Sequence, residues 1–69
     1  MIRQIKLSDL ESRDEITLYA RKSSVSDVKY AELSVWDDYE GRGGSATIYN
    51  IEELDRLIAA LFEIRKEIE

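Results

Sequence analysis

The chain has 69 residues, with 10 basic and 15 acidic side chains, and it contains neither Cys nor His. These two absences exclude disulfides, the usual zinc and iron ligand sets, thiol nucleophiles and the commonest general base. The sequence also lacks the glycine patterns of Walker and Rossmann phosphate sites. We therefore expect a non-enzymatic protein without a cofactor, folded as one domain over residues 1–69.

The small size of the chain predicts a partner subunit. Domains of this length bury only about 60% of the surface that their unfolded chains expose, so their cores are marginal. They are usually stabilised further by disulfides, a metal or a second subunit. Because the residue inventory removes the first two, we expect a homodimer. The lack of Cys, and of any apolar run long enough for a signal peptide or membrane span, predicts a cytoplasmic protein without a membrane partner.

Alternating apolar side chains predict up to four strands in the first 49 residues. The predicted strands cover residues 3–7, 15–22, 29–36 and 45–49. Residues 37–44, with the sequence DDYEGRGG, are predicted to form a flexible loop whose glycines permit positive φ angles. The pattern leaves open whether the first strand pairs within its own chain or with a neighbouring one.

A C-terminal amphipathic helix is predicted after Asn50, which is a suitable N-cap, and Glu53 lies where a capping-box acid would reach back. The apolar stripe of this helix consists of Ile51, Leu54, Leu57, Ile58, Leu61, Phe62, Ile64 and Ile68. It is about 160° wide, whereas one small sheet requires only about 100° of cover, so we expect one flank to pack on a second copy. The predicted fold class is α+β: an antiparallel sheet of three to four strands packed on one C-terminal helix.

If the aliphatic face of the sheet meets the helix, most aromatic strand residues share the opposite face. Exposed aromatic rings offer stacking surfaces for unpaired bases, at about 1–3 kcal/mol per base, while Arg and Lys follow the phosphates. Single strands suit such a surface better than a duplex, whose bases present edges. The predicted nucleic-acid-binding residues are Tyr19, Tyr30 and Trp36 for stacking, and Arg21, Lys29 and Arg42 for phosphates.

Two other interpretations of this aromatic face stay open. Cross-strand aromatic pairs stabilise sheets, and protein interfaces also use Tyr, Trp and Arg. Glu32 lies among the aromatics and would repel a phosphate, which counts against nucleic acid.

The acids of the predicted loop are the strongest candidates for a metal site. Asp37, Asp38 and Glu40 carry the oxygen ligands that Mg²⁺ and Ca²⁺ prefer. A solvated turn between two strands explains the same residues more simply, so we predict no metal site.

Residues 15–62 resemble the PC4-like single-stranded DNA-binding fold, especially its small bacterial and phage relatives. The likeness lies in a strand ending at Trp36-Asp37, the acidic glycine-containing loop, a short strand at 46–48 and an immediate Glu-Glu-Leu helix start. The resemblance implies a dimer whose curved sheets bind unpaired strands, with Trp36, Arg42 and the strand cations as contacts. The chain departs from the family where Gly43-Gly44 replaces a Lys between loop glycines, and in its surplus of acids.

These features lead to one main hypothesis and two rivals. The main one is a dimeric module that binds single-stranded nucleic acid, with an affinity that falls steeply as salt rises. The second is a small acidic inhibitor or regulator of a protein target, of the kind phages encode. In that case helix acids imitate the phosphates of DNA; they are Glu52, Asp55, Glu63 and Glu67. The third is a purely structural, self-assembling subunit, which only the wide helical stripe supports.

Overall fold

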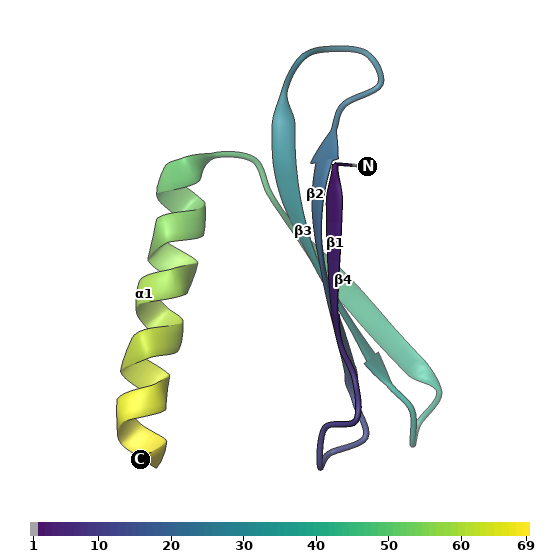
Figure 1. Ribbon diagram of the computed structural model, residues 1–69, viewed down its shortest axis with the longest axis vertical. Helices are drawn as coiled ribbons and strands as arrows, with labels where there is room; N and C mark the ends of the chain where they lie inside the picture. The colour runs from purple at the N-terminus through teal and green to yellow at the C-terminus, as the bar shows by residue number, and fades with distance from the viewer. Residues whose placement is uncertain (1) are drawn as a thin grey trace.

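The computed structural model describes residues 2–69 as a four-stranded antiparallel sheet followed by one helix (Figure 1). The elements are β1 (Arg3–Leu7), β2 (Glu15–Lys22), β3 (Lys29–Asp37), β4 (Arg42–Ile48) and α1 (Ile51–Ile68). The strands lie in the sheet in their chain order, so each pairs with the next through a hairpin. The predicted α+β class is confirmed, and β1 pairs with β2 of its own chain.

Strand pairing gives the sheet two chemically different faces, because successive side chains in a strand point to opposite sides. The inner face, which looks toward α1, is aliphatic; it includes Ile5, Leu7, Ile16, Leu18, Ala20, Ala31, Leu33, Val35, Ala46 and Ile48. The outer face is polar and aromatic; it includes Lys6, Glu15, Thr17, Tyr19, Arg21, Tyr30, Glu32, Ser34, Trp36 and Thr47. The alternation predicted for the strands therefore leads directly to the two faces.

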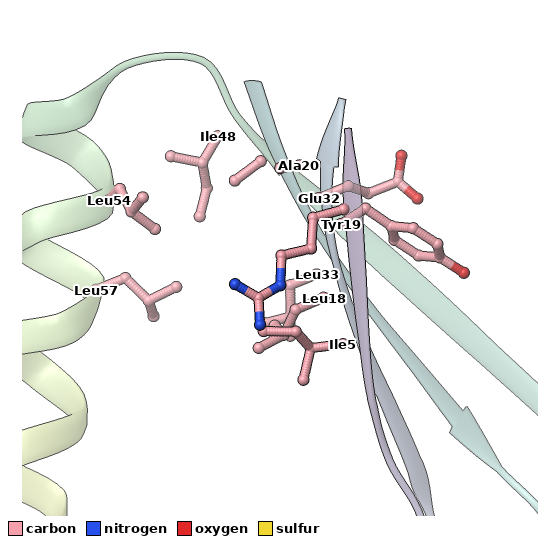
Figure 2. A pocket seen from close by; sticks show the side chains of 11 residues that line it. Ile5, Leu18, Tyr19, Ala20, Glu32, Leu33, Ile48, Leu54 and Leu57 are labelled. Carbon is pink, nitrogen blue, oxygen red and sulfur yellow. The ribbon is translucent and has the colours of Figure 1, made fainter. Parts of the chain in front are cut away.

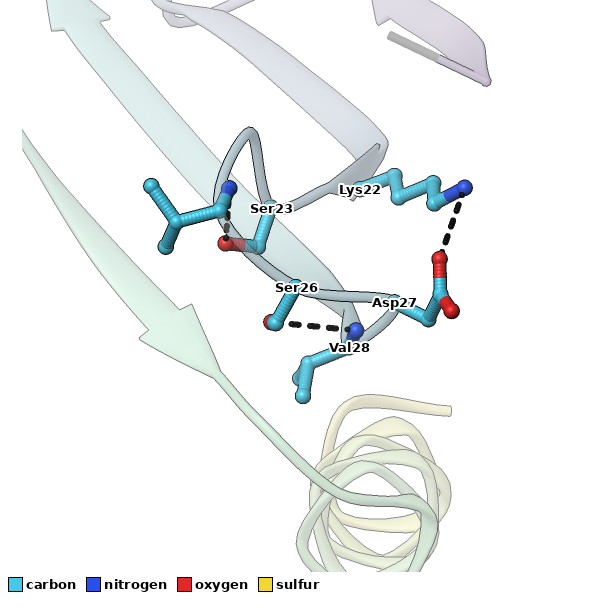
Figure 3. Close-up of polar contacts among 6 residues, drawn as sticks. Lys22, Ser23, Ser26, Asp27 and Val28 are labelled. Carbon is cyan, nitrogen blue, oxygen red and sulfur yellow. Dashed lines mark hydrogen bonds and ion pairs between the residues drawn. The ribbon is translucent and has the colours of Figure 1, made fainter.

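The β2–β3 hairpin is a serine-rich turn held by its own polar groups (Figure 3). The amide of Ser23 donates to the carbonyl of Val28 at 2.9 Å and closes the loop. Inside it, the hydroxyl of Ser26 accepts the amide of Val28 at 3.3 Å, and Lys22 pairs with Asp27 at 3.1 Å. Local side-chain acceptors of this kind are why Ser and Asp favour turns.

The β3–β4 turn is tighter than the sequence predicted, and β4 begins at Arg42 rather than at residue 45. Asp37 holds the turn: its carboxylate oxygen accepts the amides of Tyr39 and Glu40 at 3.0 and 3.2 Å. Gly41 has φ 68°, the left-handed conformation that glycine adopts without steric cost. The two following glycines belong to the strand, where they lack the side-chain alternation that reveals strands in a sequence.

Helix α1 begins at the predicted cap. The side chain of Asn50 accepts the amide of Glu53 at 2.9 Å and satisfies one of the free donors of the first turn. Acids in the first turn and the bases Arg65 and Lys66 in the last both complement the helix dipole. The helix is thus well specified by local sequence over its 18 residues.

The helix and the sheet meet only near the short link between them and diverge toward the C-terminus of α1 (Figure 1). Of the helix residues, only Leu54 and Leu57 are half-buried, and none of the described residues of the chain is fully buried. The radius of gyration is 13.8 Å, whereas a compact chain of this length has about 11 Å. The core expected between helix and sheet is therefore open in the single chain.

Candidate functional site

The outer face brings together four of the six residues predicted to bind nucleic acid. Tyr19 and Arg21 lie on β2, and Tyr30 and Trp36 lie on β3, all on the same side of the sheet. The other two lie elsewhere: Lys29 and Arg42 are the first residues of the antiparallel strands β3 and β4, so they occupy inner-face positions at opposite ends of the sheet, next to Lys22 and Asp37 respectively. Sequence alternation alone assigns Lys29 to the inner face, but Arg42 could not be assigned while it was expected in a loop.

The aromatic residues of the outer face differ in how accessible their rings are. Trp36 is 45% exposed and lies opposite Gly43, which has no side chain to cover the indole. At the other end, the rings of Tyr30 and Tyr49 lie 5.7 Å apart at 42° and form a tilted pair. Tyr49, just beyond β4, is 63% exposed. Flat rings therefore stand at both ends of the face.

The cations of the outer face are already paired with acids. The guanidinium of Arg21 lies 4.2 Å above the ring of Tyr19, and its Nε is 3.5 Å from a carboxylate oxygen of Glu32. The amine of Lys6 lies 3.5 Å from the carboxylate of Glu15 on the neighbouring strand. With two bases and two acids, this group of strand side chains carries no net charge. A polyanion would have to compete with Glu32 and Glu15 for these cations.

The remaining cations predicted to reach a phosphate backbone are distributed around the molecule. Arg42 pairs with Glu40 across the β3–β4 turn, and Lys22 pairs with Asp27. Lys29 has no ion pair within residues 2–69, and its register neighbour is the like-charged Lys22. These cations therefore do not form one basic surface with the aromatic rings.

The loop acids serve the turn. One carboxylate oxygen of Asp37 accepts two backbone amides, and Glu40 pairs with Arg42. In the part of the chain that the structure describes, no three His, Cys, Asp or Glu side chains come together as metal ligands would.

A groove between the inner face and α1 is the feature that sequence reasoning missed (Figure 2). Leu54 and Leu57 point into it from the helix, and aliphatic side chains of the sheet point into it from the other side. The groove residues with charged or aliphatic side chains on the inner face are Arg3, Ile5, Leu18, Ala20, Ala31, Leu33 and Ile48. Figure 2 shows Tyr19 and Glu32 pointing away from the groove, toward the outer side. Only the excess width of the helical stripe signalled an incompletely covered apolar surface.

The comparisons with protein-family models, with curated proteins and with solved structures all give no match. The resemblance to the PC4-like fold therefore stays a prediction. Over residues 2–69, no helix is both long and apolar enough to cross a membrane.

Proposed function

We propose that this chain is a non-enzymatic binding module that acts as a homodimer and binds single-stranded nucleic acid on the outer face of its sheet. The observation that carries the proposal is the gathering of Tyr19, Tyr30 and Trp36 on the side of the sheet that faces away from the helix. In this proposal the aliphatic inner face supports folding and association, and the aromatic outer face contacts the ligand.

Stacking, rather than charge, would provide most of the affinity. Each base stacked on an aromatic side chain contributes about 1–3 kcal/mol, and Trp36 and Tyr30 stand far enough along β3 to hold different bases. Only Arg21 and Lys6 supply positive charge among the outer-face strand residues, and both have acidic neighbours. If these two cations neutralise about two phosphates, a plot of log K against log salt concentration should have a slope of about −1.4. This dependence is shallower than the sequence alone suggested.

Intrinsic fluorescence tests the proposal directly, because Trp36 is the single tryptophan of the chain. Titration with a mixed-sequence single-stranded DNA should quench this fluorescence saturably, and a duplex of the same sequence should quench it much less. Absence of quenching by single strands at low salt would reject nucleic acid as the ligand.

A matched pair of aromatic substitutions locates the binding face. Trp36→Ala should weaken binding of a labelled oligonucleotide, followed by fluorescence anisotropy, about 5- to 150-fold, which corresponds to one lost base stack. Tyr39→Ala is the control, since Tyr39 is 94% exposed but lies in the turn beyond the strand. If the two substitutions weaken binding equally, the outer face is not the site.

One observation favours a second candidate, an acidic regulator that binds a protein. Glu52 and Asp55 are exposed on α1 and have no ion pair within residues 2–69, unlike Glu63, which pairs with Lys66. Glu53 is likewise exposed and has no ion pair there, so three carboxylates near the start of the helix suit a basic partner surface. Under this function, binding of the target would survive Trp36→Ala and would be lost when Glu52 and Asp55 are both replaced by Lys.

A further inference from the structure

The single chain exposes far more surface than a folded protein of its mass. Its accessible surface is 6086 Å², whereas a compact monomer of 8.0 kDa exposes about 4,500 Å². The excess is about 1,600 Å² per chain, or about 3,200 Å² for two chains, which lies within the range of obligate dimer interfaces. The missing cover is therefore of the size that one further copy of this chain provides.

Exposed apolar side chains lie both on the inner face of the sheet and along the helix. On the sheet, Leu18 and Val35 of the inner face are each 38% exposed. On the helix, Leu61 and Phe62 are 60% and 59% exposed. Large contiguous apolar surfaces of this kind mark interaction sites, because their exposure to water is unfavourable.

The helix has two apolar flanks, and its own sheet accounts for one of them. Leu54 and Leu57 look into the groove. Ile58 and Phe62 line a separate apolar hollow on the helix surface, together with Leu61 and Arg65. Closing the helix onto its own sheet would cover the first flank and leave the second in water.

We propose that the groove between the inner face and α1 is occupied by α1 of a second copy. By two-fold symmetry each helix then enters the groove of its partner. In this arrangement one flank of each helix packs on the partner's sheet and the other on the partner's helix. Both flanks and both inner faces are buried at once.

Charge supports the same occupant. Arg3 stands opposite Ala20 in the register, lines the otherwise aliphatic groove and has no ion pair within the described part of the chain. The segment from residue 51 to 69 carries six acids and three bases. By helical arithmetic of 100° per residue, Glu53 lies about 40° from Leu57, beside that edge of the stripe. A second α1 therefore supplies both an apolar surface and an acid for a groove that contains Arg3.

This inference rests on the dimeric part of the proposed function but not on its ligand, and cysteine crosslinking tests it in a chain that has no Cys of its own. The double variant Leu18→Cys with Leu61→Cys should form disulfides between chains on mild oxidation and run at twice the monomer mass. A mixture of the single variants Leu18→Cys and Leu61→Cys should form a disulfide between residue 18 of one chain and residue 61 of the other. The control pair is Thr17→Cys with Leu61→Cys, on the opposite face of the same strand, and it should remain uncrosslinked.

Three results would overturn the helix exchange. One is a disulfide of the double variant within a single chain at monomer mass, which means that the helix closes on its own sheet. Another is a monomer of the unmodified protein in sedimentation equilibrium at micromolar concentration. The third is a dimer in sedimentation with no crosslink in either Cys mixture, which places the second copy on another surface. Because none of these readouts involves DNA, failure of the exchange and failure of nucleic-acid binding are distinguishable.

Discussion

The two faces of the sheet differ in how far their side chains are buried within the single chain. On β2, the polar and aromatic residues Thr17, Tyr19 and Arg21 of the outer face are half-buried among their neighbours, whereas Leu18 and Ala20 of the inner face are exposed. A folded domain normally shows the opposite distribution. On β2 the outer face is therefore better covered within one chain than Leu18 and Ala20 of the inner face, although Trp36 of the outer face on β3 is 45% exposed.

The outer-face side chains of β2 are covered because their contacts run between neighbouring strands. Arg21 stacks on Tyr19 and pairs with Glu32, and Tyr30 packs on Tyr49, all through side chains that the register brings together. Such cross-strand pairs each contribute about 0.2–1 kcal/mol and need no second layer. Aliphatic side chains gain little from neighbours in the same layer, because their stabilisation comes from removal from water. The inner face therefore needs another element on top of it.

Truncation of a leucine on the inner face should destabilise the protein strongly. Leu18→Ala should lower the free energy of unfolding by about 2–5 kcal/mol, as for a leucine buried in a core, if the helix of a second copy covers it. Thr17→Ala on the outer face of the same strand should cost less than about 1 kcal/mol. Urea unfolding of both variants measures the difference, and the midpoint of the unmodified protein should rise with protein concentration.

Two results together would contradict a covered inner face. If Leu18→Ala costs no more than Thr17→Ala and the midpoint does not depend on concentration, the inner face is exposed in solution as it is in the single chain. The difference in burial between the two faces would then not affect the stability of the protein.

A smaller effect separates two neighbouring glycines that lie on opposite faces of β4. A Cβ on Gly43 would collide with the backbone carbonyl oxygen of Val35, whereas a Cβ on Gly44 would meet nothing within 4 Å. Gly43→Ala should therefore destabilise the protein by about 1–3 kcal/mol, the usual cost of forced overpacking. Gly44→Ala should change the stability by less than about 1 kcal/mol. Thermal unfolding of the two variants tests this, and equal melting temperatures would show that the turn relaxes around the added methyl group.

The sequence predicted the sheet and helix well because local periodicity determines them. Alternation gave β2 its bounds at Glu15–Lys22, and the Asn50 cap fixed the start of α1. The start of β4 was wrong because Gly43 and Gly44 have no side chains to alternate. Glycine occurs in a strand where another backbone approaches closely, and that neighbour cannot be identified until the strand pairing is known.

The candidate site was less predictable, because it depends on register and on the direction in which the helix leaves the sheet. Alternation placed Tyr19, Arg21, Tyr30 and Trp36 together, but it could not show that Arg21 would be held by Glu32. Nor does any periodicity specify the angle between α1 and the strands, which the two residues between β4 and α1 determine. The groove follows from that angle and so lay beyond sequence reasoning.

Glu32 is the acid that pairs with Arg21 on the outer face, and its replacement should have only a modest effect. Glu32→Gln removes the partner of Arg21 and the negative charge that would oppose a phosphate. Affinity for single-stranded DNA should rise about fivefold, as expected when about 1 kcal/mol of repulsion is removed, and stability should change by no more than about 1 kcal/mol. The control is Glu52→Gln, which makes the same charge change on the helix and should raise affinity less than twofold. Equal gains from the two substitutions would mean that only net charge matters, and that Arg21 does not contact the ligand.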